Sequence, residues 1–472
     1  MKPIDAPSEL HTLLARQRQA AMHSPFPAWH ERADRLKRLR TLLEKHEAEI
    51  ARAIDADFGG RPEIETELAE VYPSLAAVRD ALAHGAKWMK PRRAPVGKWF
   101  LPARAELIPQ PLGVVGIIVP WNYPLLLAVG PLVAALVAGN RVLIKMSEFT
   151  PAFSALFAQR VAEHFSVEEV SVVQGGPEVA AQFSALPLDH LLFTGSTLVG
   201  RKVMAAAAAN LTPVTLELGG KSPAVITPGY PLAHAVERIL VGKLLNAGQT
   251  CIAPDYVLLP RAQVDAFISE ARAMAARTYG EGLAAAHYCS VVTPRQYARL
   301  THLLEQDQAA GLRVEPLFAG TARDDQRHRL APHAIVDAEG QGAAMQDEIF
   351  GPLLPLVPYD RIEQALAFIQ QRPRPLALYW FDHDGARTTM ALQQTHAGGV
   401  TVNDTLLHIA QDGLPFGGVG PSGMGHYHGR YGFETFSKLK PVLYQARLNG
   451  LKLFLPPYSA LMRRLLGWMK RF

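Results

Sequence analysis

The sequence predicts an α/β fold built around parallel sheets, and three observations lead to this class. Its 472 residues exceed what one core needs, because a domain averages about 150 residues, and this suggests roughly three units. Hydrophobic residues make up 49% and charged residues 19% of the chain, a balance that excludes a disordered protein. Apolar runs of strand length alternate with helical patterns, as in parallel sheets covered by helices on both faces.

The most apolar stretch, residues 112–140, sets this pattern. It is long enough to raise the question of a membrane span, but Pro120, Asn122, Pro124 and Pro131 interrupt it. A buried strand, a Pro-bounded loop, a helix and a second strand explain it better, and this order is a βαβ crossover. We expect strands at residues 114–119, 141–145, 170–173, 190–194, 214–218 and 224–226, and helices at 125–138, 152–164 and 178–184.

Three further segments complete the expected fold. Residues 28–57 place leucines and isoleucines at near-helical intervals among many charges, which predicts an amphipathic surface helix without chemistry. Residues 91–111 are too rich in proline for a helix and are expected to form an extended arm or hairpin. From residue 233 to about 406 the alternation resumes and predicts a second α/β domain.

The net charge of +5 first suggests a nucleic-acid or membrane surface. Seven Lys and Arg residues lie after residue 439, with no acid among them, and subtracting them leaves −2 for residues 1–439. The basic character therefore belongs to the tail, and we expect no nucleic-acid partner. Only Cys251 and Cys289 are present, which predicts a reducing, cytoplasmic compartment without disulfides. The N-terminal segment lacks the continuous apolar core of a signal peptide.

A glycine-containing turn follows the strand expected at 190–194. Gly195, Ser196 and Gly200 lie in GSTLVG, just before an alanine-rich helix. Glycines at a strand-to-helix turn allow backbone N–H groups to approach a phosphate. The alternative is a tight turn in which Ser196 only caps the helix.

Two side chains have the chemistry of a nucleophile and a base. Cys251 lies in NAGQTC among small neighbours, and its thiol needs help to become a thiolate because free cysteine titrates near pH 8.5. Glu217 ends an apolar strand in LELGGKSP, where an acid is costly unless it is paired or used. A core-filling cysteine and a structural salt bridge are the alternatives.

Three more residues are candidates because of their surroundings. Asn122 is held between prolines in PWNYP, where its amide is aimed rigidly enough to meet an oxyanion; turn formation is its alternative role. Lys145 in IKMSE and Glu348 in DEIFGP complete the set, and either fits an ordinary solvated charge as well.

The motifs PWNYP, IKMSE, FTGST, LELGGKSP, NAGQTC, DEIFGP and LPFGGVGPSG occur in this order at characteristic separations. In this the chain resembles the NAD(P)-dependent aldehyde dehydrogenases over nearly its whole length. GQTCIAPDYVL and YHGRYGF are similar to the class 3 and fatty-aldehyde branch, and the FSK ending with its Pro-Pro-Tyr basic tail resembles bacterial coniferyl aldehyde dehydrogenases. Met146 departs from the proline that the family more often has after the lysine.

The resemblance implies a division of the chain into domains. Residues 1–90 and 112–217 would form a Rossmann-like NAD-binding domain, and residues 218–415 the α/β catalytic domain. Residues 91–111 and 430–450 would form a small β oligomerisation arm, followed by a basic amphipathic tail at 451–472. We expect a homodimer on this basis.

The resemblance also implies the site residues. Cys251 would be the nucleophile, Glu217 the base that activates water, and Asn122 an oxyanion donor. The expected cofactor is NAD, with NADP as an alternative, and no metal is expected. An acid at position 148 favours NAD because it repels a 2′-phosphate. The residues expected at the cofactor are Lys145, Glu148, Gly195, Ser196, Gly200, Glu348 and Phe350.

The substrate is the least determined feature. Tyr123 and Phe416 are expected to line an aromatic-friendly tunnel, which suits coniferyl aldehyde, while a broad or fatty aldehyde specificity is the alternative. A catalytically silent protein of the same fold and a cysteine-dependent esterase are further hypotheses. The tail after Tyr458 has an apolar stripe flanked by basic residues, and it is expected to dock on a dimer partner or, alternatively, to lie on an anionic membrane surface.

Overall fold

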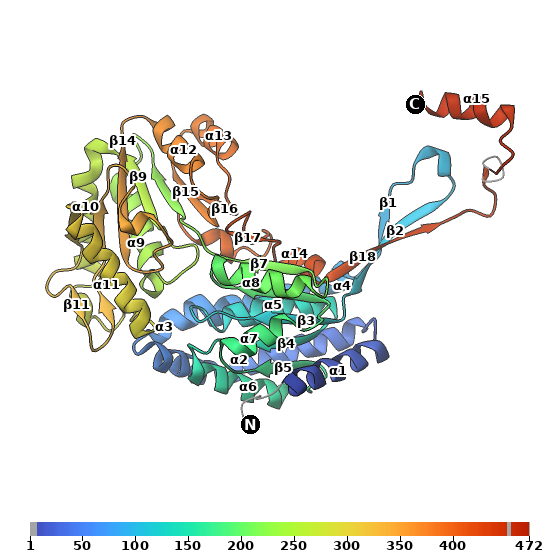
Figure 1. Cartoon of the computed structure of the whole chain (residues 1–472), viewed down its shortest axis with the longest axis horizontal. Helices are drawn as coiled ribbons and strands as arrows, with labels where there is room; N and C mark the ends of the chain where they lie inside the picture. The colour runs from blue at the N-terminus through green and yellow to red at the C-terminus, as the bar shows by residue number, and fades with distance from the viewer. Residues whose placement is uncertain (1–6, 451–454, 472) are drawn as a thin grey trace.

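A computed structural model describes residues 7–450 and 455–471. Two sheets, each with its own helices, make up the body, and a long β arm projects from it (Figure 1). The amphipathic helix expected at 28–57 is α2 (Trp29–Phe58), which buries its leucines and isoleucines. It contacts α3 (Glu63–Thr66), the π-helical turn η1 (Glu67–Val71) and α4 (Tyr72–Trp88), while α1 (Pro7–His23) packs on the first sheet.

The first sheet has six strands in the order β17-β7-β6-β3-β4-β5, and only β17 runs antiparallel to its neighbour. Every residue of β3, β4 and β6 is buried, which explains the continuous apolar runs in the sequence. The strands are β3 (Val114–Ile118), β4 (Arg141–Lys145), β5 (Val170–Val173), β6 (His190–Thr194), β7 (Val214–Glu217) and β17 (Gly423–Met424). The connecting helices are α5 (Leu126–Ala138), α6 (Pro151–His164), α7 (Pro177–Ser184) and α8 (Thr197–Ala208).

The second sheet has seven strands in the order β10-β13-β14-β9-β8-β15-β16, parallel except between β10 and β13. These strands are β8 (Pro223–Ile226), β9 (Tyr256–Pro260), β10 (Arg313–Pro316), β13 (His333–Val336), β14 (Leu353–Tyr359), β15 (Ala377–Phe381) and β16 (Gly399–Val402). The helices of this half are α9 (Leu232–Leu244), α10 (Val264–Thr278), α11 (Pro294–Ala309), α12 (Ile362–Gln370) and α13 (Gly385–Gln394). A two-stranded ribbon, β11 (Arg323–Asp324) and β12 (Arg329–Leu330), lies outside the sheet.

The proline-rich segment 91–111 was expected to form an extended arm or a hairpin, and it forms a hairpin. Its strands β1 (Arg92–Ala94) and β2 (Arg104–Pro111) join β18 (Ser437–Tyr444) in an antiparallel sheet of three strands. The range 430–450 was expected to belong wholly to this arm, but α14 (Gly429–Thr435) packs on α4 and α5 instead. The reason is apolar burial, because Phe433 on α14 is only 1% exposed.

The described part of the tail contains α15 (Ala460–Met469), which lies beyond the arm and away from both sheets (Figure 1). Ser459 caps it by accepting a hydrogen bond from the Met462 N–H at 3.1 Å, and Trp468 meets Trp99 of the hairpin edge to face with 4.8 Å between ring centroids. Residues 451–454 and 472 of the expected tail lie outside the described residues. Within 7–450 and 455–471, no helix is both long and apolar enough to cross a membrane.

Candidate active site

The carboxyl ends of the parallel strands collect the candidate residues on one edge of the first sheet. Lys145 ends β4, Glu217 ends β7, and Gly195 follows β6 directly. The register pairs Ile118 with Lys145 and Thr194 with Glu217, so these ends are neighbours. Ligands of such sheets bind outside the carboxyl ends of the strands, where the chain order reverses.

Cys251 lies on a strained loop that faces this edge. After α9 the chain passes through Asn246 and Ala247, whose φ angles of 53° and 50° are unusual for residues other than glycine. Gly248 follows with φ 77°, and a Cβ there would overlap the carbonyl of Gly351. The loop therefore needs this glycine, and its strain is of the kind found at functional sites.

The Cys251 thiol is half-buried and in its protonated form at neutral pH. Burial raises its pKa to about 12, and the nearby carboxylates of Glu348 and Glu217 act in the same direction. Cys289, in contrast, is fully buried, and its Sγ lies 3.3 Å from Asn246 Oδ1. Of the two thiols, only Cys251 is partly open, and it needs a base to become a nucleophile.

Glu217 has the properties of such a base. Its side chain is 2% exposed, and both carboxyl oxygens lack a hydrogen-bond partner among the described residues. Burial raises its pKa well above the ordinary 4.5. The structural salt bridge considered from the sequence is therefore absent from the described residues, and the carboxyl group is free to exchange a proton.

Asn122 is tied to the cysteine loop. Its Nδ2 donates to the carbonyl of Gln249 at 3.1 Å, two residues before Cys251. Its own backbone carbonyl accepts from Arg61 Nη1 and from Asn246 Nδ2, at 3.0 Å each. The next residue, Tyr123, shares a 2.6 Å hydrogen bond with Thr250 through their hydroxyls.

Lys145 and Glu148 lie side by side at the end of β4. Lys145 is 2% exposed, and its Nζ donates to the carbonyl of Met146 at 2.7 Å and approaches Glu148 Oε2 at 3.8 Å. Burial lowers the pKa of Lys145. The Glu148 side chain is 33% exposed, so the pair opens toward solvent at one end.

In the turn after β6, the structure shows helix capping, one of the two roles considered from the sequence. Ser196 caps α8, since its Oγ accepts from the Val199 N–H at 3.4 Å. A Cβ at Gly195 would lie 2.5 Å from the Phe193 ring, so this position requires glycine. The first turn of α8 leaves Leu198 67% exposed. Gly200, which is buried, faces Leu218, whose Cδ2 lies 2.6 Å from where a Cβ would be.

Glu348 lies directly over the LELGG turn. A Cβ at Gly219 would overlap the Glu348 carboxylate, so the acid packs against bare backbone. Burial raises the pKa of Glu348 to about 8, with Asp255 acting in the same direction. Two residues on, Phe350 has a φ of 50°, and its ring stands edge to face with Trp121 at 5.4 Å.

Phe416 is buried among aromatic rings. It stacks on His408 and on His428, with centroid distances of 6.0 and 5.5 Å, and meets Tyr427 edge to face at 6.1 Å. Burial raises the pKa of Tyr427, and the charges of Glu217 and Cys251 act in the same direction. An aromatic layer therefore surrounds Phe416, and the field of the candidate catalytic groups reaches Tyr427 in this layer.

Sequence reasoning missed several residues that hold these loops. Arg61, Glu65 and Glu70 lie in no recognisable motif, yet each contacts the Asn122 loop or the Cys251 loop. Asn246 and Gln249 lie in NAGQTC, but their roles in linking these two loops were not predicted. The only signal of the first three in the sequence is weak: an Arg-Pro pair after two glycines at Gly59, and acids on the buried side of the following helix.

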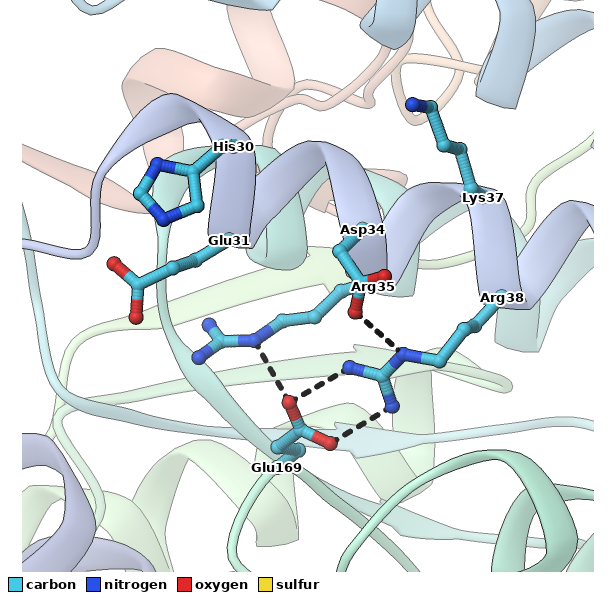
Figure 2. A pocket seen from close by; sticks show the side chains of 7 residues that line it. All are labelled: His30, Glu31, Asp34, Arg35, Lys37, Arg38 and Glu169. Atoms are coloured by element: carbon cyan, nitrogen blue, oxygen red, sulfur yellow. Dashed lines mark hydrogen bonds and ion pairs between the residues drawn. The ribbon is translucent and has the colours of Figure 1, made fainter.

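The surface pocket in Figure 2 is a different place. It lies along α2 and is lined by His30, Glu31, Asp34, Arg35, Lys37, Arg38 and Glu169. Its central acid, Glu169, is already paired with Arg35 and Arg38 at 3.1 and 2.8 Å. The charge of Glu169 is therefore compensated. None of the candidate catalytic residues lines this pocket.

A family model described as the aldehyde dehydrogenase family matches residues 14–442. The chain belongs to this family. It is 50% identical to a probable coniferyl aldehyde dehydrogenase of Pseudomonas aeruginosa, over 97% of this chain and 95% of that one. It is 43% identical to the coniferyl aldehyde dehydrogenase of Pseudomonas sp. strain HR199, over 98% and 97%, and 39% identical to aldehyde dehydrogenase family 3 member A2 of Rattus norvegicus, over 89% and 84%.

Solved structures of this family confirm the α/β fold. A substrate-bound Staphylococcus aureus AldH superposes with a TM-score of 0.90 at 34% identity, covering 98% of this chain and 99% of that one. A Mycobacterium tuberculosis aldehyde dehydrogenase complexed with NAD⁺ gives 0.83 at 28% identity, covering 94% and 91%. The protein is an NAD(P)-dependent aldehyde dehydrogenase, which argues against the silent-protein and esterase hypotheses.

Proposed function

We propose that this aldehyde dehydrogenase oxidises coniferyl aldehyde to ferulate and releases the free acid. The observation that carries the substrate is the 50% identity, over 97% of the chain, to a protein named probable coniferyl aldehyde dehydrogenase. The aromatic layer of Phe416 and Tyr427, together with Tyr123, supports a planar aryl substrate, because aromatic rings pack favourably on one another.

Cys251 performs the first step. Its sulfur bonds to the aldehyde carbon while the thiol proton passes to a base, and Glu217 is the buried carboxyl group beside it. The carbonyl electrons move to the oxygen, where the Asn122 amide and the Cys251 backbone N–H hold the negative charge. Such a donor contributes roughly 3 kcal/mol to the transition state. NAD(P), held by the residues proposed below, would supply the hydride acceptor that this oxidation needs, and Cys251 would then carry the product as a thioester.

Glu217 performs the second step, hydrolysis. After the thiol proton has passed from its carboxyl group to solvent, Glu217 takes a proton from water, the hydroxide oxygen bonds to the thioester carbon, and the carbon–sulfur bond breaks. The acid leaves, and the Cys251 thiolate takes the proton back from Glu217. The unpartnered oxygens of Glu217 and its raised pKa suit a base working near neutral pH. We therefore propose a free acid as the product rather than transfer to another thiol.

The edge of the first sheet fits a dinucleotide. We propose that Lys145 and Glu148 bind the adenosine ribose, that Gly195, Ser196 and Gly200 lie at the pyrophosphate, and that Glu348 with Phe350 binds the nicotinamide ribose. The bare backbone at Gly195 and the exposed first turn of α8 support close approach of a phosphate. NAD is the preferred cofactor, because the partly exposed Glu148 carboxylate repels a 2′-phosphate.

A broad or aliphatic aldehyde specificity is the second candidate, and one observation favours it. The Tyr123 hydroxyl is already engaged by Thr250 at 2.6 Å, and Phe416 presents only an apolar ring. Such a lining accepts a medium-length alkyl chain as readily as an aryl ring.

We also propose a cytoplasmic homodimer. We propose the cofactor domain, the catalytic domain and the arm at the ranges expected from the sequence, with α14 assigned to the cofactor domain on which it packs, and we propose that the arm joins two subunits. Helix α15 leaves Leu461 and Leu466 56% and 40% exposed, and we infer that a partner covers these apolar side chains. Docking on the second subunit is our choice; binding of the full chain to anionic but not neutral vesicles would instead indicate a membrane role.

NADH formation with coniferyl aldehyde, with an aliphatic aldehyde and without aldehyde tests this function, in parallel with NAD and NADP and with Cys251→Ala as the blank. A higher kcat/KM for coniferyl aldehyde supports the aryl substrate. A higher value for the aliphatic aldehyde supports the second candidate and contradicts the first.

A further inference from the structure

A short segment outside the recognisable motifs contacts both catalytic loops. It links α2 to α4 and contains Arg61, Glu65 and Glu70. Gly59 ends α2 with a φ of 65° and Gly60 follows at 133°, so the chain turns sharply and Arg61 points inward. The Arg61 backbone N–H is fixed by Asp55 Oδ1 at 2.7 Å.

The Arg61 side chain is fully buried against the Asn122 loop. Its Nη1 donates to the Asn122 carbonyl at 3.0 Å and lies 2.9 Å from Glu70 Oε1. The guanidinium also lies over the rings of Phe58 and Tyr123, 5.1 and 4.9 Å from their centroids. Both polar contacts come from Nη1, because Nε and Nη2 have no hydrogen-bond partner among the described residues. The planar guanidinium therefore links one carbonyl and one carboxylate through Nη1 while its plane packs against the two rings.

Glu70 holds the other end of the same loop. Its Oε2 accepts hydrogen bonds from the N–H groups of Leu125 and Leu126, at 2.7 and 3.2 Å, where α5 begins. The ion pair of Arg61 and Glu70 therefore contacts both ends of the segment 122–126, and both side chains are 0% exposed.

The same segment reaches the cysteine loop. The Glu65 carboxylate accepts the backbone N–H of Asn246, which lies in the strained turn before Cys251. Asn246 Nδ2 in turn donates to the carbonyls of Asn122 and Gln249, at 3.0 and 3.2 Å. The carbonyl of Asn122 is thus the meeting point of Arg61 from one side and the cysteine loop from the other.

We propose that Arg61 and Glu70 are positioning residues that set the distance between the two oxyanion donors, the Asn122 amide and the Cys251 N–H. The proposal rests on the oxyanion role of Asn122. A buried ion pair adds little net stability because both charges lose their hydration, so geometry is the better account of its presence. Small displacements of such donors are costly, since a 1 Å error lowers rates by up to about 100-fold.

A double-mutant cycle tests this inference. Arg61→Gln should lower kcat/KM for the aldehyde by about 10- to 100-fold, with the KM for NAD unchanged, and Asn122→Ala by about 100- to 1,000-fold. If Arg61 acts through Asn122, then the double variant should be no slower than Asn122→Ala within about threefold. If the fold losses of kcat/KM in the two single variants multiply in the double variant, the proposal is overturned.

Arg32 offers a matched control. It is 1% exposed and donates to the carbonyls of Pro27, Val137 and Ala138 at 2.9, 3.0 and 2.6 Å, away from the site. Arg32→Gln should lower Tm while kcat/KM changes less than about threefold. An equal loss of kcat/KM in Arg32→Gln would show that the effect of Arg61→Gln is general loss of packing.

Two further variants keep the test decisive if Arg61→Gln does not fold. Arg61→Gln with Glu70→Gln removes both charges and leaves no uncompensated ion. Arg61→Lys keeps the charge opposite Glu70 but loses the planar guanidinium that lies over the Phe58 and Tyr123 rings, so kcat/KM should fall at least threefold; unchanged kcat/KM would contradict the proposal. If Asn122→Ala is fully active, the oxyanion role proposed for Asn122 is wrong. If Asn122→Ala is impaired but the fold losses of kcat/KM multiply in the double variant, only the positioning role of Arg61 and Glu70 is wrong.

Discussion

The protonation state of Cys251 gives the sharpest quantitative prediction. Burial and the carboxylates of Glu348 and Glu217 raise the thiol pKa to about 12, against an ordinary value of 9.0. The reaction of the free enzyme with a small disulfide, 4,4′-dithiodipyridine, reports the thiolate directly, because only the thiolate attacks. Cys251→Ala serves as the blank for the buried Cys289.

The magnitude follows from the two pKa values. At neutral pH the thiolate fraction should be about 1,000-fold lower than for an ordinary cysteine, since each tenfold corresponds to one pH unit. A thiolate of higher pKa is also more nucleophilic, by about 16- to 32-fold over this interval for a Brønsted coefficient of about 0.4–0.5. The net rate constant should therefore be about 30- to 60-fold lower.

The shape of the pH profile separates acidity from access. Limited access to the half-buried thiol lowers the rate equally at every pH, whereas a thiol with pKa of about 12 reacts about tenfold faster for each pH unit from 7 to 10. Glu348→Gln should move the profile to lower pH by removing a neighbouring negative charge. A plateau at or below pH 9 in the wild-type enzyme would refute this reasoning.

Three other substitutions have definite outcomes. Glu217→Gln should lower turnover by about 100- to 10,000-fold and leave a thioester on Cys251, detectable by intact mass; rapid hydrolysis in this variant would exclude Glu217 as the base. Gly219→Ala should displace the Glu348 carboxylate, which lies where the new Cβ would be, and raise the KM for NAD at least tenfold, while unchanged kinetics would argue against Glu348 at the cofactor. Glu148→Ser should raise the ratio of NADP to NAD kcat/KM by about tenfold through loss of like-charge repulsion, and no change would remove Glu148 from cofactor choice.

The sheet that carries the site was predictable because its strands are buried on both faces. Strands expected at 141–145, 170–173 and 190–194 agree with β4, β5 and β6, and the strand expected at 114–119 ends one residue earlier. Parallel strands place their carboxyl ends together, which explains why Lys145, Glu217 and the turn at Gly195 lie on one edge of this sheet.

The supports of the site were not predictable in this way. Arg61 and Glu70 look like two more charges among the many of residues 28–90, and helical periodicity assigns most such charges to solvent. Their burial depends on the position of the Asn122 loop, a contact across 61 residues of sequence. The helix α14 was not predicted for a similar reason. Its packing on α4 and α5 depends on elements more than 280 residues earlier in the chain.

The electrostatics of the site assign one residue to both chemical steps. The charges that act on Cys251 come from carboxylates, which oppose ionisation of the thiol. Activation then requires transfer of the proton in the encounter with substrate, and Glu217 combines proximity, unpartnered oxygens and a raised pKa. A carboxyl group works as a base only after losing its own proton, so kcat/KM should rise with pH through the Glu217 pKa. Glu217→Gln should abolish this rise, since an amide has no proton to lose. If the same rise persists in Glu217→Gln, then another group accepts the thiol proton. Glu348 would be the first to test, because it is also a buried carboxyl group with a raised pKa, about 8.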